Sequence, residues 1–171
     1  MIQDGVGAEN WAWQCVGHNE NAAFLGPWDA DAYIVERPAG WYICADGRKI
    51  GAEYIYRLPG RGVPSGPYTR ERAESLARQM IGLGADATPP APDRLVLYQA
   101  GGLGGRDGRE AKDVTGRRWI FTAAGNTPRP CSICDELITT GWSQGRWVDA
   151  RHYVCREHVE MRDEARPAEA R

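Results

Sequence analysis

The chain has 171 residues, of which 42% are hydrophobic, and its formal net charge at pH 7 is −2. This hydrophobic content is enough to build a packed core, which argues against a disordered chain. The small negative charge excludes a global basic field of the kind that attracts nucleic acid, although a local basic patch remains compatible with it.

Neither a secretory signal nor a membrane span is indicated by the sequence. The first residues, MIQDGVGAENWAW, lack a basic start and an apolar stretch. No run approaches the roughly 18 apolar residues that a spanning helix needs. The five cysteines form an odd set, and without a secretory signal we expect metal ligands or free thiols in a reducing cytoplasm.

Residues 32–57 have the pattern of an antiparallel β-meander. The strand-like runs AYIVE and WYICA are separated by RPAG, in which Pro38 suits the second position of a turn. The pair Asp46-Gly47 then predicts a second tight turn that leads into RKIGAEYIYRL.

An amphipathic helix is predicted after the loop LPGRGVPSGPY. Thr69 is placed where an N-cap belongs, and Gly82 and Gly84 are natural stops. Between them, apolar residues recur at helical spacing, namely Ala73, Leu76, Ala77, Met80 and Ile81. We expect this stripe to pack on the meander, so that residues 1–84 form one β-β-β-α domain.

This arrangement resembles the small arm-type DNA-binding domain of some phage integrases, over roughly residues 32–83. The resemblance implies a sheet that enters the major groove with basic side chains. The strands of this chain carry three basic residues against two acidic ones, Arg48, Lys49 and Arg57 against Asp46 and Glu53.

Residues 85–130 are predicted to be a linker followed by a loop-rich β segment. ADATPPAPD has linker composition, RLVLYQA is a strand candidate, and KDVTGRRWIFTAA suggests a hairpin that turns at Thr115-Gly116. Residues 91–130 contain seven basic and four acidic residues. If a surface binds a polyanion, we expect it to include Arg106, Arg109, Lys112, Arg117 and Arg118.

Two pairs of metal-binding residue types lie near the carboxyl end. Cys131 and Cys134 form a C-x2-C knuckle. Cys155 and His158 have the same spacing, and twenty residues lie between the two pairs. Three thiolates and one imidazole complete a tetrahedral shell, which is what Zn²⁺ prefers at structural sites. Because a closed shell leaves no position for substrate or activated water, we expect a structural zinc and no enzyme.

His152, three residues before Cys155, is an alternative fourth ligand. We favour His158 because VCREHVEMRDEAR is predicted to be helical, which places Cys155 and His158 one turn apart. His152 should lie in a strand instead. The residues between the pairs predict a hairpin whose loop is Ser143-Gln144-Gly145.

The order of knuckle, hairpin and helix resembles a treble-clef zinc finger of the short kind found in small actinobacterial and phage proteins. The resemblance covers residues 130–165, PCSICDELITTGW to HYVCREHV and beyond. It implies the same four ligands, Cys131, Cys134, Cys155 and His158. Asp135 stands where a glycine often follows the second cysteine, and the family implies a metal but no single activity.

An enzyme alternative uses a different ligand set. Nucleobase deaminases carry the motif H-x-E followed later by P-C-x-x-C. The chain resembles this motif at His18-Asn19-Glu20 and at the knuckle, where Pro130 precedes Cys131. This interpretation leaves Cys155 and His158 unexplained.

The sequence thus predicts an α+β protein with a β-meander plus helix (1–84), a linker and loop-rich β segment (85–130) and a treble-clef-like zinc finger with a C-terminal helix (131–171). The predicted function is a non-enzymatic intracellular regulator or adaptor, of phage or actinobacterial origin, that docks on a protein partner. Trp142 and Trp147 are the expected anchors. The alternative is a DNA- or RNA-binding regulator that uses the zinc finger and the arginines of residues 94–118.

Overall fold

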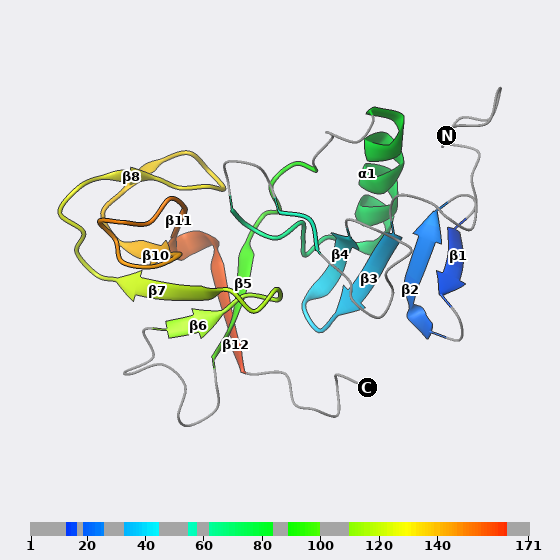
Figure 1. Ribbon diagram of the computed structural model, residues 1–171, viewed down its shortest axis with the longest axis horizontal. Helices are drawn as coiled ribbons and strands as arrows, with labels where there is room; N and C mark the ends of the chain where they lie inside the picture. The colour runs from blue at the N-terminus through cyan, green and yellow to red at the C-terminus, as the bar shows by residue number, and fades with distance from the viewer. Residues whose placement is uncertain are drawn as a thin grey trace. The chain divides into compact units, whose positions relative to one another are not determined.

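The computed structural model shows an α+β fold made mostly of strands, with one α-helix in the part of the chain that it describes (Figure 1). The chain divides into two compact units, residues 1–58 with 65–90 and residues 59–64 with 91–171. Within the described residues, no helix is long and apolar enough to cross a membrane. The described residues are 13–16, 19–25, 33–44, 55–57, 62–83, 89–99 and 110–163.

The first unit contains an antiparallel sheet of four strands in the order β1-β2-β3-β4. Its strands are β1 (Trp13–Val16), β2 (Asn19–Leu25), β3 (Tyr33–Arg37) and β4 (Gly40–Cys44). The turn at Pro38 that joins β3 to β4 is confirmed. β1 and β2 were not expected from the sequence, and the turn expected at Asp46-Gly47 lies outside the described residues.

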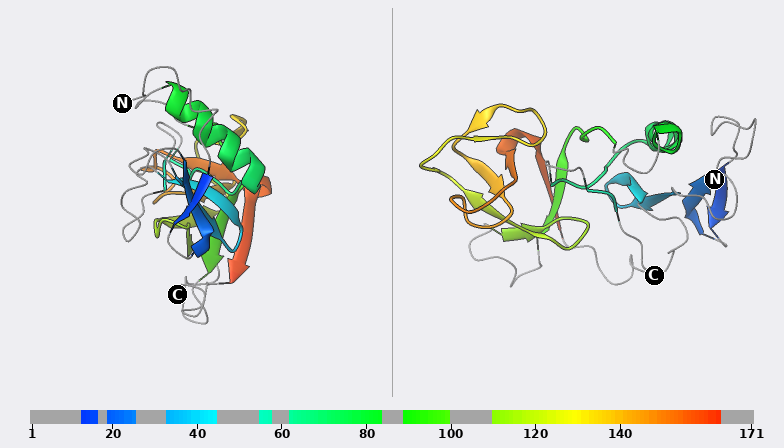
Figure 2. Two further views of the ribbon diagram at one scale, coloured as in Figure 1. Left: turned by 90° about the vertical axis from the view of Figure 1, so that its right-hand side faces the viewer. Right: turned by 45° about the horizontal axis from the view of Figure 1, so that its top comes forward.

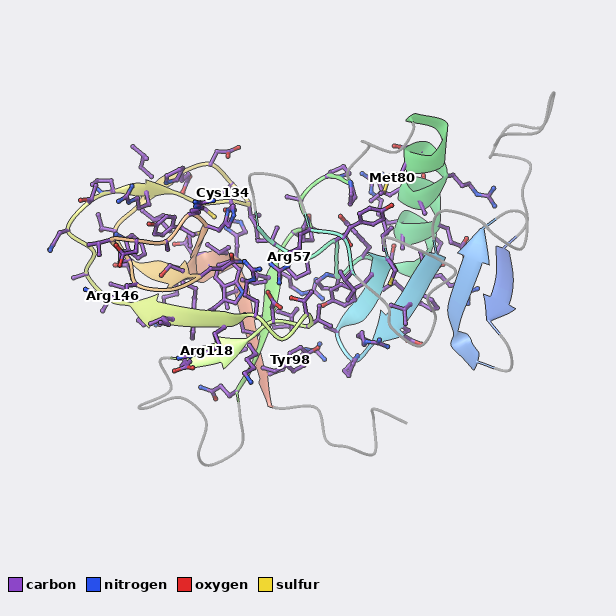
Figure 3. The ribbon with its side chains drawn as sticks, viewed as in Figure 1. Arg57, Met80, Tyr98, Arg118, Cys134 and Arg146 are labelled. Atoms are coloured by element: carbon purple, nitrogen blue, oxygen red, sulfur yellow. The ribbon has the colours of Figure 1, made fainter. Side chains whose placement is uncertain are left out.

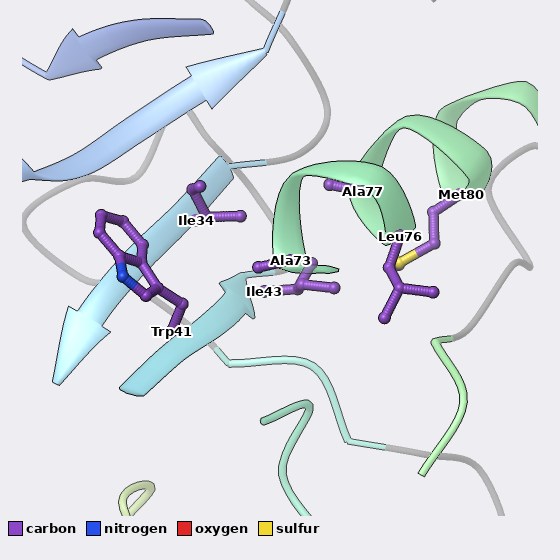
Figure 4. Close-up of a cluster of buried hydrophobic side chains, with 7 residues drawn as sticks. All are labelled: Ile34, Trp41, Ile43, Ala73, Leu76, Ala77 and Met80. Atoms are coloured by element: carbon purple, nitrogen blue, oxygen red, sulfur yellow. The ribbon is translucent and has the colours of Figure 1, made fainter. Parts of the chain in front are cut away.

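The helix α1 (Arg70–Leu83) packs its apolar stripe on this sheet, as predicted. Thr69 caps its start, since the backbone N–H of Arg72 donates to Thr69 Oγ1 at 3.2 Å. The buried cluster between helix and sheet (Figure 4) contains Ile34, Trp41, Ile43, Ala73, Leu76, Ala77 and Met80. Burial of such side chains stabilises a fold by about 1.5–3 kcal/mol for each large one.

Three residues on the face of β3 and β4 opposite α1 are buried as well. Val35, Tyr42 and Cys44 alternate with the cluster residues along β3 and β4, and all three are at most 3% exposed. A sheet that enters a DNA groove needs exposed, basic side chains on its outer face. These three positions therefore do not provide the surface that the integrase resemblance implies.

The second unit contains a sheet of six strands in the order β11-β10-β7-β6-β5-β12. Its strands are β5 (Leu95–Gln99), β6 (Glu110–Lys112), β7 (Arg118–Thr122), β10 (Gly141–Ser143), β11 (Tyr153–Cys155) and β12 (Val159–Asp163). The strand expected in RLVLYQA and the hairpin that turns at Thr115-Gly116 are both confirmed. Residues 85–130 therefore supply three strands to the same sheet as residues 141–163, and that sheet spans the domain boundary expected at residue 130.

This sheet curls until its two edges are close together. β11 and β12 lie at opposite ends of the strand order, yet only the 3-10 turn Arg156–His158 separates them in sequence. The chain acts as one broken strand, whose first half pairs with β10 and whose second half pairs with β5. The right-hand view of Figure 2 shows the curl of this sheet.

The prediction of a helix from Cys155 onward is wrong. One 3-10 turn is followed by β12, which runs parallel to β5 in the register Val159↔Leu95 to Asp163↔Gln99. Val159 and Met161 alternate with polar residues, a pattern that a strand can use. Pairing with a strand far away in sequence outweighs the local helical preference.

The hairpin expected around Ser143-Gln144-Gly145 is also wrong in its pairing. β10 ends at Ser143 but pairs with β11, while the short strand β9 (Leu137–Ile138) pairs with β8 (Arg129–Pro130). At Gly141 an added Cβ would lie 2.6 Å from the carbonyl oxygen of Val154. The close approach of β10 and β11 therefore requires glycine there.

We expect Leu76→Ala to lower the free energy of unfolding of the first unit by about 2–5 kcal/mol, because it leaves a cavity beneath α1. Urea unfolding followed by circular dichroism measures the change. Gln79→Ala, on the exposed side of the same helix, is the matched control and should change stability by less than about 0.5 kcal/mol. Equal effects of the two substitutions would contradict the packing described for α1.

Candidate metal centre

The knuckle Cys131–Cys134 forms the tip of a short hairpin between β8 and β9. The backbone N–H of Asp135 donates to Cys131 O at 2.9 Å, and the N–H of Cys131 donates to Glu136 O at 2.8 Å. Asp135 has φ +65°, a left-handed conformation that Asp tolerates better than most residues do. The position where glycine was expected from the resemblance thus has the backbone conformation that favours glycine.

The knuckle is attached to the outer edge of β11. Cys131 forms a parallel bridge with Tyr153, and the N–H of Ser132 donates to Tyr153 O at 2.7 Å. Since the other edge of β11 pairs with β10, the knuckle continues the hydrogen bonding of the sheet. This attachment brings the first pair of cysteines to the second ligand pair.

The second pair lies at the break between β11 and β12. Cys155 is the last residue of β11, and His158 ends the 3-10 turn that follows it. A 3-10 helix has three residues per turn, so side chains three positions apart point the same way. Cys155 Sγ and His158 Nδ1 are 2.7 Å apart.

The four side chains form one cluster, in which the ligand atoms of Cys131, Cys134, Cys155 and His158 all lie within 4.8 Å of one another. Cys134, labelled in Figure 3, has its sulfur 3.8 Å from that of Cys155. A disulfide has a sulfur–sulfur distance of about 2.05 Å, and the three cysteines are free. The cluster can therefore bind a metal ion.

Cys131 and Cys155 have opposite pKa shifts. Burial raises the pKa of Cys131, but the backbone N–H groups of Cys134, Cys155 and Ile133 that point at its sulfur together lower it below its ordinary value. Burial, and then the hydrogen bond and charge of Cys131, raise the pKa of Cys155 to about 12. The Cys155 thiolate is thus disfavoured without a cation, whereas a bound divalent cation would stabilise it.

His152, the alternative ligand, is not part of this cluster. It precedes β11 and its ring packs against Gly62, where an added Cβ would lie 2.3 Å from His152 Cδ2. His18, the histidine of the deaminase alternative, lies outside the described residues. The two residues that this alternative left unexplained, Cys155 and His158, are close to the knuckle.

The tryptophans expected to anchor a partner are buried instead. Trp142 and Trp147 are 5% and 6% exposed. The Trp142 ring packs on Phe121 with centroids 5.4 Å apart, and Trp147 packs edge-on against Tyr153 and donates from Nε1 to Thr127 O at 2.9 Å. They are therefore core residues of the second unit, and the expectation that they are anchors is wrong.

Comparison of the chain with protein-family models, with curated proteins and with solved structures gave no match. The interpretation of the cluster therefore depends on its own geometry.

We expect His158→Gln to weaken metal binding by about 100-fold or more, because an amide replaces one of four ligands. Elemental analysis of protein purified without chelator, followed by competition with a chromophoric zinc chelator, measures stoichiometry and affinity. His152→Gln is the matched control and should retain the metal of the wild-type protein. If His152→Gln lost the metal and His158→Gln retained it, the fourth ligand would be His152, and the assignment to His158 would be wrong.

Proposed function

We propose that Cys131, Cys134, Cys155 and His158 bind one Zn²⁺ ion, which fastens the knuckle to the break between β11 and β12. Around tetrahedral zinc, with bonds of about 2.3 Å to sulfur, two thiolates lie about 3.8 Å apart. The 3.8 Å between Cys134 and Cys155 fits this spacing. The pair Cys155 and His158, at 2.7 Å, has to open to about 3.6 Å around the same ion.

The proposed role of this zinc is structural. Four protein ligands close a tetrahedral shell, so no coordination position is left for a substrate or water. β8 and β9 have two residues each, too few to hold the knuckle by backbone pairing alone. In small zinc modules the metal contributes about 10–16 kcal/mol of binding free energy, which acts as folding energy.

The likeness to a treble-clef finger supports this proposal in part. The knuckle and the two ligand pairs have the order of that motif. The helix that completes it is replaced here by the turn Arg156–His158 and by β12. We therefore propose a zinc finger whose second ligand pair is built into a strand break.

The function that we propose is a non-enzymatic regulator or adaptor that docks on a protein partner. The cluster of four possible ligand side chains is the observation that supports it, because four protein ligands around one ion favour a structural over a catalytic metal. Leu137, on β9 directly after the knuckle, is 72% exposed and replaces the buried tryptophans as the proposed anchor. An exposed leucine on a metal-stabilised hairpin can fill an apolar pocket of a partner.

We expect Leu137→Asp to lower recovery of the partner at least about tenfold, a loss of ~1.4 kcal/mol in binding free energy. Affinity capture from cells of the source organism, with quantitative mass spectrometry, compares this variant with wild-type protein. Val148→Asp is the matched control, because Val148 is the other strongly exposed aliphatic residue among those that the structure describes, at 56%. Identical captured sets, with zinc content unchanged, would contradict docking through the knuckle.

A DNA- or RNA-binding regulator is the second candidate. Lys112, Arg117 and Arg118 are exposed on the β6–β7 hairpin, and Arg146, on the β10–β11 connection, is also exposed (Figure 3). Opposing this function, Arg118 forms an ion pair with Glu110, and Arg117 donates to Gln144 Oε1 at 3.2 Å. Arg106 and Arg109, of the same arginine cluster, lie outside the described residues.

If the three hairpin residues contact phosphates, the affinity for duplex DNA or RNA should fall roughly 40-fold between about 50 and 200 mM salt, with a logarithmic slope of about −2.7. Fluorescence anisotropy with a labelled duplex measures this slope. Arg117→Gln should reduce it by about 1, whereas Arg72→Gln on the exposed face of α1 should not. Absence of binding at low salt would remove this candidate.

A further inference from the structure

Within the second unit, a short segment of residues 62–64 lies against the connection between β10 and β11. Gly62 is buried with φ +71°, and an added Cβ would be 2.3 Å from both Cγ and Cδ2 of His152. Cβ atoms essentially never approach a non-bonded heavy atom this closely, so with the His152 ring in this position the space fits glycine and no larger residue. Val63 and Pro64, the next two residues, are fully buried.

The side chain of Gln144 forms a hydrogen bond with the backbone of the same segment. Its Nε2 donates to Gly62 O at 2.6 Å, its Oε1 accepts from Arg117 Nη1 at 3.2 Å, and its backbone N–H donates to His152 O at 3.2 Å. Because the oxygen of the amide faces the guanidinium, its nitrogen is directed at the glycine carbonyl. The amide is therefore held in the orientation that recognises a peptide carbonyl.

Arg117 is itself held in place by the β6–β7 turn. Asp113, 3% exposed, accepts from the backbone N–H groups of Thr115 and Arg117 at 2.8 and 3.2 Å and from Trp119 Nε1 at 2.9 Å. The buried carboxylate thus fixes the backbone from which the Arg117 side chain extends. Two turns of the sheet are in this way preorganised around one short segment.

We propose that His152 and Gln144 form a peptide-recognition site that selects glycine, that the chain's own Gly62–Pro64 segment occupies it, and that a partner's Gly-Val-Pro-like segment binds there when this segment is displaced. The Gly62 position has no room for a Cβ, and Gln144 donates to the carbonyl of the same residue. In the recognition of extended peptides, main-chain hydrogen bonds give affinity and the space offered to each side chain gives specificity. The site requires neither the metal nor Leu137, so it goes beyond the function proposed above.

The chain's own segment competes strongly with an external peptide, because tethering gives it an effective concentration on the order of millimolar. Removal of that competitor should therefore reveal the site. Gly62→Ala in the full-length protein does this, since the new methyl group collides with His152 while the site itself stays intact.

The probe is a labelled peptide of residues 57–68, RLPGRGVPSGPY, with binding measured by fluorescence anisotropy. We expect the Gly62→Ala protein to bind it at least tenfold more tightly than wild-type protein does. The same peptide with alanine at the Gly62 position should bind at least tenfold more weakly. Gln144→Ala added to the Gly62→Ala protein should abolish the gain.

Gly116→Ala is the matched control for backbone strain. Gly116 also has a positive φ, +84°, but an added Cβ there meets nothing within 4 Å. This protein should bind the peptide no better than wild-type protein does. Equal binding of the peptide by the wild-type, Gly62→Ala and Gly116→Ala proteins, or equal binding of the glycine and alanine peptides, would overturn the proposal.

A second variant covers the case in which Gly62→Ala does not fold. Gln144→Ala removes the carbonyl contact without adding bulk, and hydrogen exchange with mass spectrometry reports on residues 62–68. Exchange in this segment should become at least tenfold faster, while α1 and β5 keep their wild-type protection. Unchanged exchange in the segment would show that Gln144 does not hold it, and the proposal would fail.

Discussion

The second unit depends on three residues, Arg156–His158, that join the two edges of its curled sheet. Because β11 pairs with β10 and β12 pairs with β5, the chain has to cross the opening of the sheet at this turn. Of the four clustered side chains, Cys155 directly precedes this turn and His158 ends it, and the other two lie on the knuckle bonded to β11. The proposed zinc would stabilise the turn, the knuckle and the edge of β11 together.

Both units bury apolar side chains, and the second unit also uses polar groups to fix its loops. In the first, an apolar cluster between α1 and one face of the sheet provides the core, so its stability follows from burial. In the second, polar groups fix the loops, with Asp113 holding one turn and Gln144 connecting it to Gly62. Removal of one partner of such a buried polar group costs more than an average hydrogen bond, because the other partner is left unsatisfied.

The elements that the sequence predicted correctly are those encoded within a few residues. Thr69 and the spacing of Ala73, Leu76 and Met80 are sufficient to specify α1, and the cysteine spacing is sufficient to locate the cluster. The errors involve long-range pairing. The residues after Cys155 can form a helix locally, and only β5, which lies next to them in the fold, makes them a strand. The tryptophans fit an interface as well as a core, so their burial could not be read from composition. Gly62 and Gln144 gave no sequence signal beyond a glycine in a loop, because their contact spans 82 positions.

The parallel pairing of β12 with β5 has a consequence for the order in which the protein is made. Leu95 and Val159 are partners although 64 positions separate them (159 minus 95). The first unit ends at Pro90, so its helix and sheet can assemble on the ribosome while the rest of the chain is still being synthesised. The curled sheet has to wait until its last strand emerges, and until then β5 presents an open edge to the chaperones of the cell.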